Sequence, residues 1–371
     1  MNMKGEVMLK RVLVILLVFI GSLDSLLAQS RPQTPRPPFP YLTREVSYKN
    51  ARDGTVIGGT LTVSKRKGRF PAVVLLPGSG AVDRDQTMLG HKPFAVIADY
   101  LARRNIAVLR VDSRGVGKST GNYYNSTGDD FSNDVLAGIE FLKQQKEIDT
   151  EQIGLIGHSL GSIIAPFVAA KTNDVKFIVL LGAPAFSGDE TFAVRFNQTL
   201  RAKNLPEAEM QKFLAVLREF QEMQKQNAND EKMRPVVREL LKAVFPFQPS
   251  EKDLDDAVAQ QLAVQKTPYA KFFSAYDPRE SLKKVTCPVL ALNGSLDVIV
   301  SAKENLSAIY DSLSHNNDVT VMEIYGINHL FQTAKTGSPT EYEKIEESIS
   351  PKVLEIIADW IGDHSSKPRH K

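Results

Sequence analysis

The sequence predicts an α/β fold, with a mostly parallel sheet of about eight strands flanked by helices and one inserted helical segment. Short continuous apolar runs recur along the chain, as expected of strands that are buried on both faces of a parallel sheet. Amphipathic segments separate most of these runs and predict the covering helices. The runs are residues 72–76, 106–111, 153–156, 177–181, 289–292 and 319–324.

The N-terminal residues 1–28 have the pattern of a secretory signal peptide. Three basic residues precede the apolar run 12–20, and Ala28 provides a small residue for cleavage. The apolar run is shorter than the ~20 residues that span a bilayer, so we expect no stable membrane insertion after cleavage, with a retained anchor as the alternative. The only cysteine, Cys287, excludes an intramolecular disulfide. Together these features predict export to the periplasm or medium of a bacterium.

The proline-rich residues 29–40 predict an extended linker, with folded structure from about Tyr41. The first part of the core is then expected over 41–185. It should begin with two antiparallel strands, at 45–48 and 61–63, and a bulge at Gly58-Gly59. Pro93 at a first helical position predicts a helix from 93 to 103. Further helices are expected after Ser159, Ala302 and Pro351.

Residues 186–275 interrupt the alternation of strands and helices, because no strand pattern occurs there. Three apolar faces at helical spacing are centred near Leu217, Leu240 and Val258. In open α/β domains such an insertion most often covers the carboxyl edge of the sheet, where ligands bind. We therefore expect a helical lid. The second part of the core is expected over 276–362, and a disordered tail over 363–371.

A serine lies between two glycines where one apolar run ends. Residues 157–161 read Gly-His-Ser-Leu-Gly and join the strand at 153–156 to a helix at 163–170. Glycines are expected on both sides because side chains there would collide with the neighbouring strand and helix. An ordinary glycine-rich turn is the alternative, but the strand–turn–helix context favours Ser159 as an exposed nucleophile.

A serine hydroxyl is a weak nucleophile at neutral pH, so this interpretation requires a base and a group that orients the base. Of the six histidines, His329 lies just beyond the last predicted strand, at the same sheet edge as Ser159. Asp297 follows the preceding strand and is the predicted acid. Its alternative role is to cap a turn, and Asp189 is a weaker competitor for the acid.

Fixed hydrogen-bond donors must also stabilise the charge that develops on the carbonyl oxygen. We expect the backbone N–H groups of Leu160 and Ser79, the latter in the loop Pro-Gly-Ser-Gly at 77–80. A glycine turn without a catalytic role is the alternative for that loop. In Asp83-Arg84-Asp85, Arg84 could bind a substrate carboxylate, but an ion-pair cluster that braces the loop is favoured.

Composition narrows the choice of ligands. The net charge of +3 is small and the basic residues are scattered, so nucleic acid is not an expected partner. His, Cys and carboxylate residues show no metal-ligand spacing, so no metal and no cofactor are expected. Residues 115–119 end like a phosphate-binding loop, but Asp112 replaces its first glycine.

Four motifs resemble the α/β-hydrolase superfamily, and in detail secreted bacterial esterases and serine-aminopeptidase-like hydrolases. They are PGSGAVDRD at 77–85, KPF at 92–94, RVDSRGVGKS at 110–119 and GHSLG at 157–161. The similarity covers residues 41–362 and is weak through the insertion. It implies that Ser159, Asp297 and His329 form the catalytic triad.

From these residues we expect a serine hydrolase that cleaves small-molecule carboxylic esters with a hydrophobic portion through an acyl-enzyme. An aminopeptidase or amidase of the same fold is the main alternative. It would need an acidic group for the substrate amine, for which Glu190, Glu219 and Asp277 are candidates. A thioesterase, or a non-catalytic binding protein that keeps the hydrolase fold, completes the alternatives.

Overall fold

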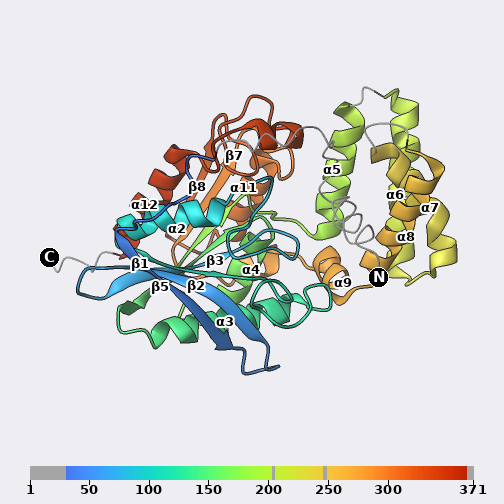
Figure 1. Ribbon diagram of the computed structural model, residues 1–371. Helices are drawn as coiled ribbons and strands as arrows, with labels where there is room; N and C mark the ends of the chain where they lie inside the picture. The colour runs from blue at the N-terminus through green and yellow to red at the C-terminus, as the bar shows by residue number, and fades with distance from the viewer. Residues whose placement is uncertain (1–30, 203–204, 245–248, 366–371) are drawn as a thin grey trace. The chain divides into compact units, whose positions relative to one another are not determined.

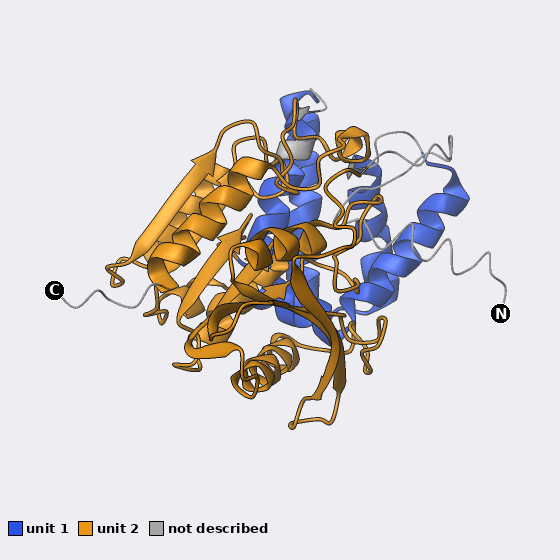
Figure 2. Cartoon of the chain, turned by 60° about the vertical axis from the view of Figure 1, so that its left-hand side comes forward, with its two compact units in different colours: residues 1–25, 187–276 blue, residues 26–186, 277–371 orange. Residues whose placement is uncertain are grey.

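The computed structural model describes residues 31–202, 205–244 and 249–365. The predicted signal peptide, residues 1–28, therefore lies outside the described residues. Two compact units divide the described chain (Figure 2): residues 187–276 form one, and the chain before and after this stretch forms the other. Among the described helices, none has the length and apolar character needed to cross a membrane.

An eight-stranded sheet forms the centre of the larger unit (Figure 1). Its strands lie in the order β1-β2-β4-β3-β5-β6-β7-β8. Only the pairs β1/β2 and β2/β4 are antiparallel, which confirms the predicted α/β fold class. The strands are β1 (Tyr41–Lys49), β2 (Val56–Ser64), β3 (Phe70–Leu76), β4 (Ala107–Val111), β5 (Ile148–His158), β6 (Phe177–Leu181), β7 (Val289–Gly294) and β8 (Val319–Ile324).

Helices cover both faces of this sheet. Helix α2 packs with α12, and α3 packs with α4; Figure 1 shows α2 and α3 on opposite sides of the strands. Apolar residues of α2 and α12 pack on the central strands in one buried cluster, because both helices carry a continuous apolar stripe. The helices are α2 (Pro93–Arg103), α3 (Gly128–Lys143), α4 (Leu160–Ala169), α10 (Arg279–Leu282), α11 (Ala302–Ser312), η1 (Pro339–Lys344) and α12 (Pro351–Ser365).

Helix α3 was not predicted, because its buried face is only partly apolar. Gly128, Ser132, Asp134 and Gly138 lie on that face together with apolar residues, so the usual hydrophobic periodicity is weak. The available signal was a capping box at its start. There the Asp130 carboxylate accepts hydrogen bonds from the backbone N–H and the hydroxyl of the preceding threonine, at 2.8 and 2.9 Å.

The predicted bulge at Gly58-Gly59 is wrong. Both glycines pair in regular register with β1, and they are needed for a different reason. A Cβ atom at Gly58 would lie 2.5 Å from the Cβ of Lys118, and one at Gly59 would lie 2.5 Å from the carbonyl oxygen of Arg110. Close approach of neighbouring backbone, rather than a change of register, explains the glycine pair.

The proline-rich segment is held against the larger unit, so the expectation that folded structure begins near Tyr41 needs correction. The Arg31 guanidinium donates to the carbonyl oxygens of Leu89, Glu343 and Ile345. The Gln33 amide bonds the backbone of residues 348–349 in both directions. At the other end, α12 continues to Ser365, three residues into the predicted tail, and residues 366–371 lie outside the described residues.

Residues 187–276 contain five helices within the described part of the chain. Their buried apolar residues, including Leu217, Leu240 and Val258, form one cluster. Phe245, which the sequence pattern adds to the apolar face centred near Leu240, lies outside the described residues. The role of this unit as a lid stays a prediction. The helices are α5 (Gly188–Ala202), α6 (Glu207–Lys225), α7 (Asp230–Val244), α8 (Glu251–Gln265) and α9 (Pro268–Ala275).

Candidate active site

Ser159 occupies a strained turn between the end of β5 and the start of α4. Its φ and ψ angles are 52° and −114°, a combination that non-glycine residues rarely adopt and that clusters at functional sites. A Cβ atom at Gly157 would lie 2.3 Å from the carbonyl oxygen of Gly161, and one at Gly161 would lie 2.0 Å from that of Leu76. Only glycines therefore allow the strand, turn and helix to pack this closely.

Asp297 and His329 form a buried hydrogen bond. The distance from His329 Nδ1 to Asp297 Oδ2 is 2.7 Å, and the two side chains are 4% and 0% exposed, respectively. The other carboxylate oxygen, Oδ1, accepts hydrogen bonds from the backbone N–H groups of Ile299 and Val300, both at 2.8 Å. The carboxylate is thus held by its own loop while it orients the imidazole.

The end of β6 brings this pair to the serine turn. The backbone N–H of Ser159 donates to the carbonyl oxygen of Leu181, at 2.8 Å. The next residue, Gly182, has a positive φ of 59°, and a Cβ atom there would lie 3.2 Å from His329 Nδ1 and 3.4 Å from Asp297 Oδ2. Gly182 therefore leaves room for Asp297 and His329 beside the turn at residues 157–161, which is called the elbow below. The role of Gly182 was not predictable from the sequence, because one glycine after a strand has many possible causes.

A second pair of buried side chains shapes the loop that carries His329. Asn328 Oδ1 accepts hydrogen bonds from the backbone N–H groups of Leu330 and Gln332, each at 3.0 Å. The Asn328 side chain also donates to Gln332 Oε1 at 2.9 Å. Both polar side chains are fully buried. Their role depends on the loop conformation, so no sequence motif revealed it.

The predicted oxyanion donors, Ser79 and Leu160, lie in the loop after β3 and at the start of α4. In the loop after β3, the N–H of Gly78 donates to Gln86 Oε1 and that of Gly80 to the Tyr123 hydroxyl, both at 3.0 Å. Within the described part of the chain, the Ser79 N–H between them has no hydrogen-bond partner. Leu160 is the first residue of α4, where N–H groups lack intrahelical acceptors.

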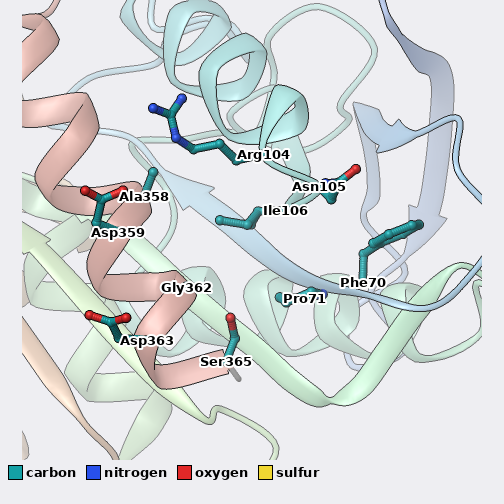
Figure 3. Close-up of a pocket in the computed structure, with 10 residues that line it drawn as sticks. All are labelled: Phe70, Pro71, Arg104, Asn105, Ile106, Ala358, Asp359, Gly362, Asp363 and Ser365. Atoms are coloured by element: carbon teal, nitrogen blue, oxygen red, sulfur yellow. The ribbon is translucent and has the colours of Figure 1, made fainter. Parts of the chain in front are cut away.

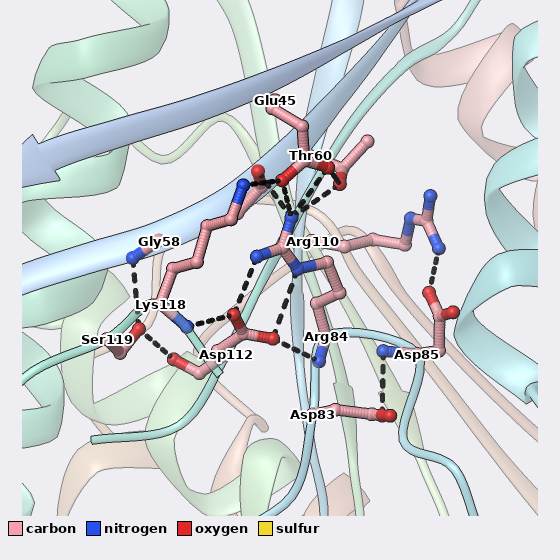
Figure 4. Close-up of polar contacts among 11 residues, drawn as sticks. Glu45, Gly58, Thr60, Asp83, Arg84, Asp85, Arg110, Asp112, Lys118 and Ser119 are labelled. Atoms are coloured by element: carbon pink, nitrogen blue, oxygen red, sulfur yellow. Dashed lines mark hydrogen bonds and ion pairs between the residues drawn. The ribbon is translucent and has the colours of Figure 1, made fainter. Parts of the chain in front are cut away.

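Arg84 lies at the centre of an ion-pair cluster (Figure 4). Its Nε and Nη2 atoms pair with Asp112 at 3.1 and 2.6 Å, and its Nη1 lies 2.9 Å from Glu45. Asp112 also accepts hydrogen bonds from the backbone N–H groups of Arg84 and Lys118. Because its charge is already paired and the side chain is only 14% exposed, Arg84 braces the loop that follows β3 and does not present a free cation to a substrate.

Acidification is expected to destabilise the protein in two pH ranges. Burial, followed by the charge of the nearby His329, lowers the pKa of His158 from 6.5 to about 4, with smaller opposing effects of the hydrogen bond to the His329 backbone and of Asp297. A hydrogen bond from Lys118 is the largest cause that lowers the pKa of Glu45 from 4.5 to about 2. In both cases the unfolded chain binds the proton first as the pH falls, so stability is lost.

The His158 contribution should disappear between about pH 6.5 and 4, at a cost of about 3 kcal/mol. That of Glu45 should disappear between about pH 4.5 and 2. Urea unfolding midpoints measured at constant ionic strength test this expectation. A midpoint that stays constant or rises from pH 7 to 4 would contradict it.

The other predicted carboxylates have different partners. Asp189, the competitor for the acid, lies on α5 in the unit 187–276, and His329 bonds Asp297 instead. Of the candidates for binding a substrate amine, Asp277 pairs with Arg279 at 2.6 Å. Glu190 accepts hydrogen bonds from the backbone and hydroxyl of Ser187. Glu219 is exposed on α6.

A cavity of about 600 Å³ lies at the opposite edge of the sheet (Figure 3). Phe70 begins β3 and Ile106 immediately precedes β4, so this cavity opens at the amino ends of strands whose carboxyl ends face Ser159. It is therefore separate from the candidate site. Among the described residues, no group of three or more His, Cys, Asp or Glu side chains is placed to hold a metal ion. The remaining residues around the cavity are Pro71, Arg104, Asn105, Ala358, Asp359, Gly362, Asp363 and Ser365.

Comparison with known proteins assigns the family. The model of the X-Pro dipeptidyl-peptidase (S15) family matches residues 28–331. The chain belongs to this family. Esterase EstD of Thermotoga maritima is 26% identical over 318 residues, which cover 84% of this chain and 67% of the relative.

Two solved structures share the fold. DcsB, in complex with its substrate analogue, has a TM-score of 0.56 and 18% identity, over 88% of this chain and all of that chain. The Pyrococcus furiosus esterase Pf2001 has a TM-score of 0.54 and 17% identity, over 91% of this chain and 97% of that one. Taken with the family match, the fold makes this protein a hydrolase of the α/β-hydrolase superfamily.

Proposed function

We propose that the protein is a serine hydrolase that cleaves carboxylic esters of small to medium hydrophobic compounds. The observation that supports this most strongly is the buried Asp297–His329 hydrogen bond beside Ser159 on its strained turn. An oriented imidazole close to a serine on such a turn is the arrangement that activates a hydroxyl for acyl transfer.

In the first half of the proposed reaction, His329 acts as the general base. Its Nδ1–H donates to Asp297, which leaves the lone pair on Nε2 to accept the proton of the Ser159 hydroxyl. Ser159 Oγ then forms a bond to the acyl carbon, and the carbonyl oxygen becomes an oxyanion. The N–H groups of Leu160 and Ser79 would stabilise that charge.

In the second half, the proton returns to the products. His329 transfers it from Nε2 to the leaving alkoxide, which departs as an alcohol and leaves the acyl group on Ser159. Water then loses a proton to His329 and attacks the acyl carbon. The acid is released, and Ser159 regains its proton. An ester needs less protonation of its leaving group than an amide, so these residues suffice for the cycle.

Peptide hydrolysis is the second candidate, because the family model that matches is described as an X-Pro dipeptidyl-peptidase. An enzyme of that kind must hold a charged substrate amine. Two of the carboxylates considered for this task, Asp277 and Glu190, already have protein partners. The relative from Thermotoga maritima is described as an esterase. Both points favour ester cleavage for this chain.

Labelling with a fluorophosphonate probe tests the nucleophile. We expect the wild-type protein to be modified at Ser159, as mapped by mass spectrometry, and Ser159→Ala to remain unlabelled. Removal of the nucleophile should reduce hydrolysis of p-nitrophenyl esters by at least about 10³-fold. A folded wild-type protein that takes up no probe would contradict the proposal and favour a non-catalytic binding protein.

A substrate panel separates the two candidate activities. Short-chain and medium-chain p-nitrophenyl esters are compared with X-Pro p-nitroanilides at equal enzyme concentration. Ester cleavage with negligible anilide cleavage is expected. A higher kcat/KM for an X-Pro anilide than for every ester would instead identify a peptidase.

Export is part of the same proposal. The basic and apolar pattern of residues 1–28 supports processing after Ala28. N-terminal sequencing of the protein recovered from a bacterial host's periplasm or medium should begin at Gln29. Recovery of the intact N-terminus from the membrane fraction would favour the retained anchor.

A further inference from the structure

One buried chain of hydrogen bonds joins three loops at the candidate site. The backbone N–H of Gly78 donates to Gln86 Oε1 at 3.0 Å. Gln86 Nε2 and His158 Nδ1 are 2.9 Å apart, and His158 Nε2 lies 2.9 Å from the carbonyl oxygen of His329. The chain therefore runs from the predicted oxyanion loop, through the residue before the nucleophile, to the residue that carries the general base.

The groups at the two ends set the direction of every bond in this chain. A backbone N–H can only donate, so the amide oxygen of Gln86 must face Gly78 and its NH₂ group must face His158. His158 Nδ1 is then the acceptor, and the proton of the neutral ring lies on Nε2. A carbonyl oxygen can only accept, and that of His329 faces this proton. All three bonds are satisfied by one arrangement, in which His158 is neutral.

We infer that Gln86 and His158 are positioning residues for ester hydrolysis. They hold the predicted oxyanion loop and the loop that carries His329 at fixed positions relative to the elbow. This inference rests on the proposed function. Neither side chain acts on the acyl group; each acts through the backbone of its neighbours. Ser159 follows His158 directly, so a shift of that ring also moves the nucleophile.

Burial and packing support a fixed position for both side chains. Gln86 and His158 are 4% and 6% exposed. A Cβ atom at Gly78 would lie 3.3 Å from His158 Nδ1 and 3.5 Å from the Cβ of Ser159, so the loop and the elbow are in close contact. The low pKa of His158, about 4, keeps its ring neutral near neutral pH. The charged or titratable neighbours that act on it are His329 and Asp297.

This hydrogen-bond chain is tested by three single variants and by the double variant Gln86→Met, His158→Leu. His158→Leu removes both bonds of the ring, and Gln86→Met removes the bonds to Gly78 and to His158. His158→Gln is the conservative variant, because its amide NH₂ group reaches the region of Nε2 and can donate to the His329 carbonyl. The kcat and KM for a p-nitrophenyl ester are measured for each, with the thermal unfolding midpoint and the rate of fluorophosphonate labelling.

We expect His158→Leu and Gln86→Met to lower kcat by about 10- to 100-fold, because displacement of reacting groups by about 1 Å has effects of this size. KM should stay within about threefold. The double variant should lose little more than the more impaired single variant, since both changes break one chain. His158→Gln should recover most of the lost kcat.

A structural control separates positioning from stability. Asn50→Ala removes a buried hydrogen bond to Asp134, of 2.7 Å, from a residue that is 2% exposed. It should lower the unfolding midpoint without changing kcat. Variants of Gln86 and His158 that behave in the same way, with kcat within twofold of wild type, would overturn the inference.

Two further outcomes are decisive. Gln86→Met leaves the bond between His158 and His329 intact. It therefore tests the positioning role even if His158→Leu does not fold. A wild-type protein that hydrolyses no ester and takes up no probe would overturn the proposed function and this inference with it. If the wild type is active and the losses of kcat add up in the double variant, only the inference that Gln86 and His158 act through one hydrogen-bond chain would be overturned.

Discussion

Asp297→Asn is expected to lower kcat by about 10³- to 10⁴-fold, with KM within about threefold of wild type. The structure explains why this nearly isosteric change is so damaging. The N–H groups of Ile299 and Val300 both point at Oδ1, so the amide oxygen of asparagine must take that position. Its NH₂ group then faces His329 Nδ1. The imidazole must carry its proton on Nε2, where it can no longer accept the proton of Ser159.

The control for this prediction is Asp189→Asn. Asp189 is the carboxylate that competes with Asp297 in the sequence, but it lies on α5 and has no bond to His329. Its substitution should leave kcat within about twofold of wild type, as is typical of changes outside the catalytic groups. A loss below tenfold for Asp297→Asn, measured on folded protein by steady-state kinetics, would show that Asp297 does not orient the base.

Asp112→Ala is expected to lower the free energy of unfolding by about 3–5 kcal/mol, because it leaves the Arg84 guanidinium buried without its main partner. Burial opposes ionisation of Asp112, but the hydrogen bonds and charge of Arg84 outweigh it and lower the pKa of the carboxyl. Two backbone N–H groups also lose their acceptor. The measurement is urea unfolding at pH 7, with the slope compared between variants.

An exposed ion pair of the same cluster provides the contrast. Lys118 and Glu45 lie 2.9 Å apart, but their side chains are 66% and 58% exposed. Lys118→Ala should therefore cost no more than about 1 kcal/mol. Equal losses for Asp112→Ala and Lys118→Ala would contradict the role of burial. The double variant Arg84→Met, Asp112→Leu should regain part of the loss, because no charge is then left unpaired.

The sheet was predictable because its strands are local in sequence and strongly patterned. Each fully buried strand reads as an apolar run, and the predicted helix at 93–103 matches α2. Prediction failed where local pattern and tertiary environment disagree. The buried face of α3 includes glycine, serine and aspartate, and Gly58-Gly59 serve close backbone contact, which looks like a bulge signal in the sequence alone.

In the candidate site, too, some features could be predicted from the sequence and others depend on tertiary contacts. Ser159, Asp297 and His329 each follow a strand, and parallel strands bring their carboxyl ends to one edge, so the order of the motifs was enough to group them. Their catalytic role stays a prediction. The sequence also favoured a bracing role for Arg84, and the ion pairs with Asp112 and Glu45 agree with it.

By itself, the sequence determined the order of the candidate residues along the chain: Ser159 in its glycine-flanked turn, then Asp297, then His329. Only the tertiary structure decided which groups support them. Gln86 and His158 are 72 residues apart, and His158 and His329 are 171 apart, yet each pair shares one hydrogen bond. Such contacts depend on loop conformation and burial at the sheet edge. Local propensity and hydrophobic periodicity carry no information about either.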